Sequence, residues 1–294
     1  MKKLSVTQFQ FYKSNKSDRL QMKAVELFKK ENKVDLLLLI VYNYSCNKIT
    51  ALIIRKVKSM KTILFQGDSI TDCGRYRKVT DKKENGIAFF RDGRLFKKIT
   101  ALGEGYPAKV TAELKKAFPD EYRYINRGVG GDRITDVYSR IVKDIIKLKP
   151  DYMSLLVGVN DVWRNYDSEG TGTGKARFEK VYNMLLEELK EELPQLKIII
   201  MGPFVLPGTA TAAVKDRPDC YADFRRDVEE LAEITKSAAE KYGCAYIDLQ
   251  KVLDEASKGC VAGELSGDGV HPSDKGHEII TREWIKAFSE LGEE

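Results

Sequence analysis

The sequence predicts an α/β fold in which helices cover both faces of a parallel sheet. From Met60 onward, short runs rich in β-branched and apolar residues alternate with longer stretches that include helix-patterned sequence. Such βαβ alternation is typical of parallel sheets covered by helices. At 294 residues and 43 % hydrophobic content the chain can bury a large core. One main domain with an appendage therefore fits better than two equal domains.

Five short strand-like runs are the expected strands, and they are Lys61–Gln66, Tyr122–Asn126, Tyr152–Val157, Lys197–Met201 and Cys244–Asp248. Helical patterning extends over Phe178–Leu193 and Phe224–Lys241, and Ser273-Asp274 mark the expected start of a last helix. Ligands of open α/β sheets bind at the carboxyl ends of the strands. Residues that directly follow a strand are therefore candidates for a functional site.

A serine follows the first of these strands, in the block Gly67-Asp68-Ser69-Ile70-Thr71-Asp72. A serine hydroxyl becomes a good nucleophile when an imidazole takes its proton and a carboxylate orients that imidazole. The chain has two histidines, and Asp268-Gly269-Val270-His271 places one of them three residues after an aspartate. Ser69, Asp268 and His271 are thus the candidate catalytic residues of a serine hydrolase. The Gly-x-Ser-x-Gly elbow of the α/β-hydrolases is missing, because Thr71 stands at the second glycine position.

Two more blocks carry residue types that suit acyl transfer. Asn126 to Asp132 reads NRGVGGD, and Gly158 to Asp161 reads GVND. Acyl transfer develops a negative oxygen that fixed donors stabilise, and losing one donor typically costs about a hundred- to a thousandfold in rate. Glycine lets the backbone approach a ligand closely, and the asparagine amide is a neutral donor. Composition alone does not distinguish the glycines of the second block.

Together the four blocks resemble those of the SGNH or GDSL hydrolases. The resemblance implies a flavodoxin-like three-layer α/β/α sandwich with a five-stranded parallel sheet in the order 2-1-3-4-5. It also implies an oxyanion hole made by the backbone amides of Ser69 and Gly131 and by the side-chain amide of Asn160. The strings GDSITDCGR (67–75) and GVNDVW (158–163) look most like those of bacterial acetylxylan esterases and related carbohydrate esterases.

That likeness implies hydrolysis of acetyl esters on sugars or oligosaccharides. A lysophospholipase or acyl-thioesterase of the same fold is the alternative among enzymes, and a non-catalytic carbohydrate-binding protein is the alternative outside them. Each block also has a simpler explanation: Ser69 or Asn160-Asp161 could cap a helix, and Asp268-Gly269 could be only a turn. Coincidence of four such features in the right order favours the catalytic interpretation.

Other polar and aromatic residues lie near the blocks. We expect Asp68 and Trp163 in the substrate pocket, although Trp163 fits the core equally well. His277 is expected on a helix face, and Cys73 is expected to pack without pairing with a second histidine. A metallohydrolase using Asp68, Asp72, Asp268 and His271 is disfavoured, because zinc sites normally draw on more His or Cys. We therefore expect no metal and no cofactor.

Charge is distributed unevenly along the chain. Residues 1–59 hold 13 Lys or Arg and 4 Asp or Glu, a balance of +9, whereas residues 60–294 hold the remaining 37 and 40, a balance of −3. This distribution argues against a nucleic-acid partner for the main domain. The apolar run Val34–Tyr42 is too short to span a bilayer, which takes about 20 residues. Five cysteines, an odd number without paired metal spacing, favour a reducing cytoplasmic setting.

The domain boundary is expected at Met60. We expect Met60 to be the natural start, with residues 1–59 a basic extension from an upstream start and 60–294 the catalytic domain; an appendage that docks on the domain is the alternative. The charged segment 76–105 and the glycine-rich segment 166–176 are expected to shape access for a small-molecule or oligosaccharide ester. A homo-oligomer is compatible with the sequence.

Overall fold

The computed structural model describes residues 36–43, 48–55, 60–76, 87–91, 94–166, 170–214, 217–261 and 263–292. The chain divides into two compact units, Met1–Met60 and Lys61–Glu294. In the first unit, β1 (Leu36–Asn43) pairs with β2 (Lys48–Arg55) in an antiparallel two-stranded sheet. The apolar run around residues 36–42 therefore forms a strand.

The second unit is built on a five-stranded, all-parallel sheet. Its strands are β3 (Lys61–Gly67), β6 (Tyr122–Asn126), β7 (Tyr152–Leu156), β8 (Lys197–Met201) and β11 (Ala245–Ile247). Their order is β11-β8-β7-β3-β6, which is 2-1-3-4-5 when counted from the opposite edge. The expected strands and their order are thus confirmed. The central strands β3 and β7 are buried along almost their whole length, which explains their continuous apolar sequence.

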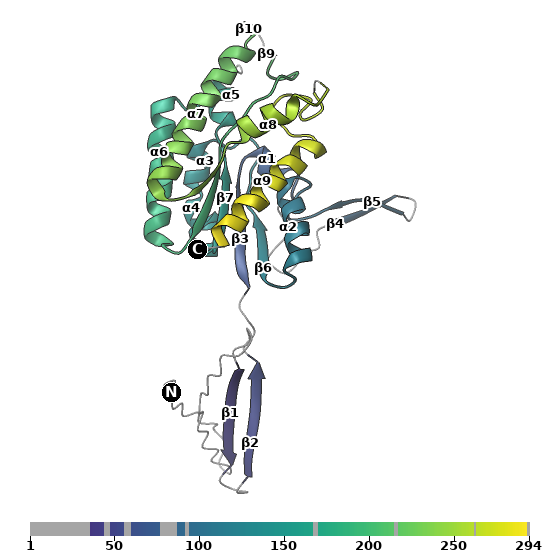
Figure 1. The fold of residues 1–294 in the computed structure, drawn as a ribbon, viewed down its shortest axis with the longest axis vertical. Coiled ribbons are helices and arrows are strands. Elements are labelled where there is room, and N and C mark those ends of the chain that lie inside the picture. The colour runs from purple at the N-terminus through teal and green to yellow at the C-terminus, as the bar shows by residue number, and fades with distance from the viewer. Residues whose placement is uncertain are drawn as a thin grey trace. The chain divides into compact units, whose positions relative to one another are not determined.

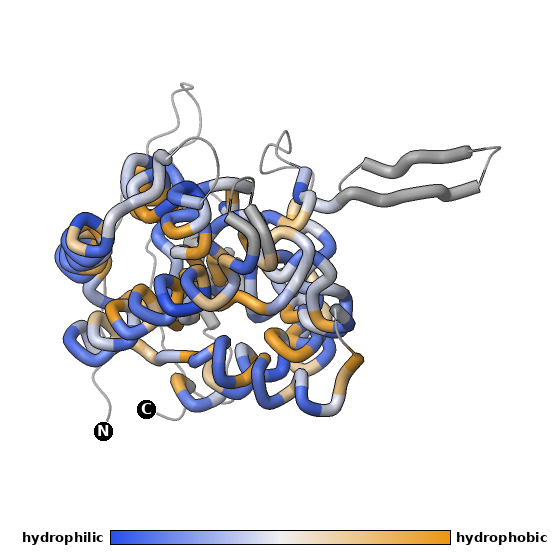
Figure 2. The backbone as a smooth tube through the Cα atoms, turned by 90° about the horizontal axis from the view of Figure 1, so that it is seen from above, coloured by the Kyte–Doolittle hydropathy of each residue, from blue (hydrophilic) through white to orange (hydrophobic). Residues whose placement is uncertain are grey.

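Helices form a layer on each face of this sheet (Figure 1). One layer contains α3 (Ile134–Ser139), α6 (Lys175–Glu192) and α7 (Tyr221–Tyr242), in which α6 contacts both α3 and α7. The other contains α2 (Tyr106–Ala117), α8 (Leu249–Ser257) and α9 (Asp274–Gly292). The longer helices alternate between blue and orange along their length in Figure 2, as amphipathic helices do. The α/β/α sandwich is therefore confirmed.

Smaller elements connect these layers. They are α1 (Ser69–Asp72), α4 (Ile141–Asp144), a 3-10 turn (Ile146–Leu148), α5 (Val159–Tyr166) and the short pair β9 (Ala213–Val214) and β10 (Arg217–Pro218). Between Arg75 and Tyr106 an antiparallel hairpin forms from β4 (Ile87–Arg91) and β5 (Arg94–Ile99). Residues 77–86 and 92–93 of that segment lie outside the described part. No helix in the described ranges combines the length and apolarity needed to cross a membrane.

Candidate active site

Three adjacent strands bring the first three sequence blocks to one edge of the sheet. The order β7-β3-β6 places the carboxyl ends of these strands side by side, and the blocks begin at Gly67, Asn126 and Gly158. Ser69 begins α1 directly after β3. Parallel strands all end at the same edge, so the blocks gather where an open α/β sheet binds its ligands.

Asp68 caps the helix that Ser69 begins. Its Oδ1 accepts a hydrogen bond from the backbone N–H of Ile70 at 2.9 Å. The side chain is fully buried, and burial raises the pKa of this carboxyl to about 7. The expectation that Asp68 lines the substrate pocket is not met, because a side chain without exposed surface cannot contact a substrate.

Ser69, His271 and Asp268 form a continuous hydrogen-bonded line. The Ser69 Oγ lies 2.8 Å from His271 Nε2, although 202 residues separate them in the chain. On the other side of the ring, His271 Nδ1 lies 2.6 Å from Asp268 Oδ2. This spacing is the arrangement in which an imidazole can take a serine proton while a carboxylate fixes its tautomer.

The carboxylate of Asp268 is held in its charged form. Its Oδ1 accepts the backbone N–H groups of Val270 at 2.9 Å and His271 at 2.8 Å. Partial burial opposes ionisation, but the hydrogen bonds from the His271 ring and from these two amides together lower the pKa of Asp268. A negative charge therefore remains beside the ring.

Ser266 organises the turn that carries both residues, a role that the sequence analysis missed. This side chain is buried, its Oγ accepts the N–H of Gly269 at 2.9 Å, and it lies 3.2 Å from Asp268 Oδ1 and 2.8 Å from the His271 carbonyl. A serine in the string Ser266-Gly267-Asp268-Gly269 is a local signal for such a side-chain-to-backbone turn. Gly269 adopts a φ of +90°, and a β-carbon there would lie 2.3 Å from the Leu206 carbonyl. Glycine is required at this position.

The loop that follows β8 supports the same turn from behind. Backbone N–H groups of this loop donate to three consecutive carbonyls of the turn: Thr209 to Gly267 at 3.2 Å, Ala210 to Asp268 at 3.0 Å and Leu206 to Gly269 at 2.8 Å. The turn is therefore anchored to the loop that follows β8 and is not held by the Ser69, His271 and Asp268 contacts alone.

A glycine loop (Gly128–Gly131) lies against the serine. A β-carbon on Gly130 would be 3.7 Å from Ser69 Cβ, and one on Gly128 would be 2.5 Å from the Asp72 nitrogen. Gly131 adopts a φ of +84°. The close approach at Gly128 and the positive φ of Gly131 need glycine, whereas the Gly130 position is at ordinary contact distance from Ser69. The backbone of this loop therefore borders the space next to Ser69, where an ester carbonyl would sit.

Asn160 and Asp161 join α5 to the segment that follows the glycine loop. The Asn160 Nδ2 donates to the Asp132 carbonyl at 3.1 Å, which fixes the orientation of the amide. The carboxylate of Asp161 caps α3 by accepting the Ile134 N–H at 3.1 and 3.2 Å, and burial raises its pKa to about 7. The sequence left open that Asn160-Asp161 caps a helix, and Asp161 does cap the neighbouring helix α3. The Asn160 amide instead contacts the residue that follows the glycine loop.

Trp163 lies next to the histidine. Its ring centroid is 6.2 Å from that of His271 and 6.5 Å from that of Phe224 on α7. The side chain is only partly buried, with one side packed on the core. Trp163 therefore packs on the core with one side and keeps some surface exposed next to His271, so it has features of both the core and the pocket positions that the sequence left open.

Cys73 and His277 are in contact, contrary to the sequence-based expectation for Cys73. Its Sγ lies 3.5 Å from His277 Nε2, and the Tyr106 backbone N–H donates to His277 Nδ1 at 3.2 Å. Because Nδ1 accepts, the proton of the neutral ring is on Nε2, so the ring cannot take the thiol proton. Burial raises the pKa of the thiol and lowers that of His277 to about 4. His277 does lie on a helix, α9, but it is buried.

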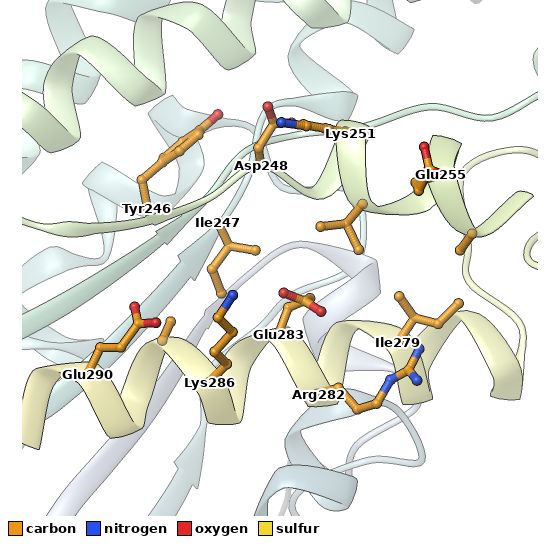
Figure 3. Close-up of a pocket in the computed structure, with 13 residues that line it drawn as sticks. Tyr246, Ile247, Asp248, Lys251, Glu255, Ile279, Arg282, Glu283, Lys286 and Glu290 are labelled. Carbon is orange, nitrogen blue, oxygen red and sulfur yellow. The ribbon is translucent and has the colours of Figure 1, made fainter.

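No three His, Cys, Asp or Glu side chains cluster as metal ligands within the described ranges. A groove of about 560 Å³ does lie elsewhere, between β11, α8 and α9 (Figure 3). Its lining combines apolar side chains, which include Ile247 and Ile279, with charged side chains of both signs, among them Lys251, Glu255 and Lys286. None of the triad residues lines it. We place the candidate site at Ser69, because the hydrogen-bonded serine, histidine and aspartate side chains lie there and not in the groove.

The chain is similar to known proteins in sequence and in fold. The model of the GDSL-like lipase/acylhydrolase family matches residues 65–279. An acetylxylan esterase of Geobacillus stearothermophilus is 32 % identical over 233 residues, which cover 79 % of this chain and 95 % of that protein. Its structure superposes with a TM-score of 0.63 at 32 % identity, over 79 % of this chain and 95 % of that chain. A GDSL-like protein of Parabacteroides merdae gives a TM-score of 0.66 at 28 % identity, over 79 % of this chain and 97 % of that one.

Some structures of the Geobacillus enzyme are described as catalytic mutants, in which a serine, an aspartate or a histidine is replaced by alanine. The aspartate and histidine of that enzyme stand three positions apart, as Asp268 and His271 do here. The family model covers more than half of this chain, and the fold and sequence of these relatives agree with it. The chain belongs to the GDSL-like lipase/acylhydrolase family.

Proposed function

We propose that the enzyme hydrolyses acetyl esters on sugars or oligosaccharides, with Ser69 as nucleophile, His271 as general base and then acid, and Asp268 as the group that orients the histidine. The observation that carries the mechanism is the hydrogen-bonded line from Ser69 Oγ to His271 Nε2 at 2.8 Å and from His271 Nδ1 to Asp268 Oδ2 at 2.6 Å. The substrate class is supported by the similarity to the Geobacillus acetylxylan esterase.

In the first step the Ser69 Oγ attacks the acetyl carbonyl carbon while His271 Nε2 takes the hydroxyl proton. The carbonyl oxygen becomes negative in the tetrahedral intermediate. The carboxylate of Asp268 stabilises the imidazolium that forms, because its charged form is favoured by the backbone amides that it accepts. The intermediate then expels the sugar hydroxyl, which receives its proton from His271.

The developing negative oxygen needs donors that are already in place. The backbone amides of Ser69 and Gly131 and the side-chain amide of Asn160 are our candidates. Asn160 has two N–H groups, of which one is engaged by the Asp132 carbonyl. The second can point to the oxyanion, and the first prevents the amide from turning away.

Deacylation repeats the sequence with water. His271 takes a proton from a water molecule, the hydroxide attacks the acetyl-serine, and the same donors stabilise the second intermediate. Collapse returns the proton from His271 to Ser69 Oγ and releases acetic acid, which ionises to acetate in water. No redox change occurs, and the residues named above supply every proton transfer.

The four described cysteines, Cys73, Cys220, Cys244 and Cys260, are free thiols. We therefore also propose that the enzyme works in a reducing compartment such as the cytoplasm, where thiols persist.

The test is a series of p-nitrophenyl esters together with acetylated xylo-oligosaccharides. Each buried methylene is worth about 0.8 kcal/mol, so an open apolar groove makes kcat/KM rise with chain length, and a small acyl pocket gives the reverse slope. We expect the acetate ester to be cleaved best and the octanoate ester at least about tenfold less well. This ratio corresponds to a difference of about 1.4 kcal/mol in activation free energy. Ser69→Ala serves as the control and should be inactive on every ester. A profile that peaks at octanoate would favour a lysophospholipase or acyl-thioesterase instead.

A further inference from the structure

Asp72 connects the end of α1 to the glycine loop. It is the last residue of α1, three positions after Ser69. Its Oδ2 accepts the backbone N–H of Gly130 at 3.2 Å. The side chain keeps only 11 % of its surface exposed, so water competes little for this hydrogen bond.

Arg75 holds the same loop from a second side. Its Nε donates to the Gly128 carbonyl at 2.8 Å and lies 3.5 Å from Asp72 Oδ1. Only 8 % of this arginine side chain is exposed. The two charged groups thus neutralise one another while they contact one amide and one carbonyl of the glycine loop. Hydrogen bonds that involve an ionised partner are shorter and stronger than neutral ones.

We infer that Asp72 and Arg75 are positioning residues that clamp the glycine loop, so that the Gly131 amide is set for the oxyanion. This inference rests on the proposed function. Gly131 directly follows Gly130, whose N–H Asp72 holds, and a displacement of the backbone at Gly130 moves the next amide with it. A misplacement of about 1 Å can cost a hundredfold in rate. The clamp acts through the loop and touches no substrate.

Other contacts keep the loop folded when the clamp is removed. The Val129 N–H donates to the Gly67 carbonyl at 3.0 Å, and the Gly128 N–H donates to Asn126 Oδ1 at 2.9 Å. Neither contact holds Gly130. Loss of the clamp should therefore shift the position of the Gly130 and Gly131 amides without unfolding the segment.

The experiment compares Asp72→Ala and Arg75→Gln with the wild-type full chain on p-nitrophenyl acetate. The concentration of active enzyme is measured by complete labelling of the reactive serine with a fluorophosphonate, and each rate is divided by that concentration. A lower yield of folded enzyme therefore does not lower the measured kcat. Each variant should lose at least about tenfold in kcat, with KM within about twofold, since a donor to the oxyanion acts in the transition state. The inhibition constant of phenylboronic acid, which forms a tetrahedral adduct on serine, should weaken by a similar factor.

A matched control is Asp151→Ala. The Asp151 Oδ2 accepts the Thr62 N–H at 2.7 Å at the opposite, amino-terminal end of β3. The substitution therefore removes a carboxylate-to-amide hydrogen bond of the same type, but away from the site. Its kcat should stay within about twofold of wild type. A folded Asp72→Ala or Arg75→Gln with wild-type kcat and boronate affinity would overturn the clamp. Retained activity of Ser69→Ala would instead overturn the proposed function, so the two failures are distinguishable.

Discussion

Asp268 binds His271 twice: one carboxylate oxygen lies 2.6 Å from the ring Nδ1, and the other accepts the backbone N–H of the same residue at 2.8 Å. The carboxylate therefore fixes both the position of the histidine in its turn and the tautomer of its ring.

Replacement of Asp268 by asparagine tests the second of these effects. The new side-chain amide would have to present its oxygen to Nδ1–H while it also serves two backbone amides, and its neutral form cannot stabilise an imidazolium. We expect Asp268→Asn to lower kcat on p-nitrophenyl acetate by about 10⁴-fold, the size of the effect in a serine-protease triad. The control is Asp274→Asn on α9, whose exposed carboxylate pairs with Lys109 at 2.7 Å. It should change kcat less than twofold. Turnover of folded Asp268→Asn within tenfold of wild type would contradict the assigned role.

Ser266→Ala should weaken the turn that holds the Asp268 and His271 pair. The variant removes the acceptor for the Gly269 N–H and the hydroxyl near the His271 carbonyl, and it leaves a buried donor unpaired. We expect the free energy of unfolding to fall by about 1–2 kcal/mol and kcat to fall by about tenfold, measured by urea denaturation and by ester hydrolysis. Ser257→Ala is the matched control, because its hydroxyl donates to the Asp254 carbonyl at 2.7 Å on the exposed side of α8. Equal effects in both variants would show that Ser266 has no special relation to the site.

The strands and the proximity of Ser69, Asp268 and His271 could be predicted from the sequence for physical reasons. Central parallel strands covered on both faces are largely apolar, as β3 and β7 are, whereas the edge strand β6 (YRYIN) is only partly buried and carries polar residues. Two histidines leave few choices of general base. The strand order and the choice of Gly131 came from the family resemblance, because neither is encoded in local periodicity.

Contacts between distant segments were not predictable in the same way. Cys73 and His277 are 204 positions apart and meet only because α9 returns to the end of α1.

The burial of Asp68 had a local signal, since an aspartate before a short helix is a common cap. The hairpin of β4 and β5 also had one, because Asp92-Gly93 stands between its strands and such pairs favour two-residue turns.

Stability should depend on pH through Asp68. Its folded-state pKa is raised from 3.8 to about 7 by burial, so between these values the folded protein binds a proton that the unfolded chain has released. Stability therefore falls as pH rises from about 4 to 7, by up to about 1.4 kcal/mol per pH unit. Asp68→Asn cannot ionise and should show a smaller decline over this range in urea denaturation. Asp161, whose pKa is also raised to about 7, should preserve part of the decline. An unchanged slope in Asp68→Asn would show that this carboxyl does not titrate with folding.

We propose residues 60–294 as the catalytic domain, and a chain that starts at Met60 tests this boundary. Met1–Met60 and Lys61–Glu294 are separate compact units, and every candidate site residue lies in the second unit. The shortened chain should unfold cooperatively and retain kcat within about twofold of the full chain. Its charge balance is −3 rather than +6, so its binding to a cation-exchange resin should weaken. An insoluble or unfolded product, with a sound full chain, would make residues 1–59 a structural part of the domain.

Trp163 should distinguish sugar esters from simple esters. Its ring is partly exposed and lies 6.2 Å from the His271 ring between centroids. In the proposed mechanism His271 protonates the departing alcohol, and aromatic faces suit the C–H surfaces of sugars. For acetylated xylo-oligosaccharides, we expect Trp163→Ala to raise KM by about tenfold, which corresponds to about 1.4 kcal/mol. For p-nitrophenyl acetate the change in KM should be less than about twofold, and Trp163→Phe should recover most of the loss. Phe224→Leu alters the buried ring behind Trp163 and controls for packing. If Phe224→Leu reproduces the effect, or if both substrates are affected equally, Trp163 supports the core or the triad rather than the sugar.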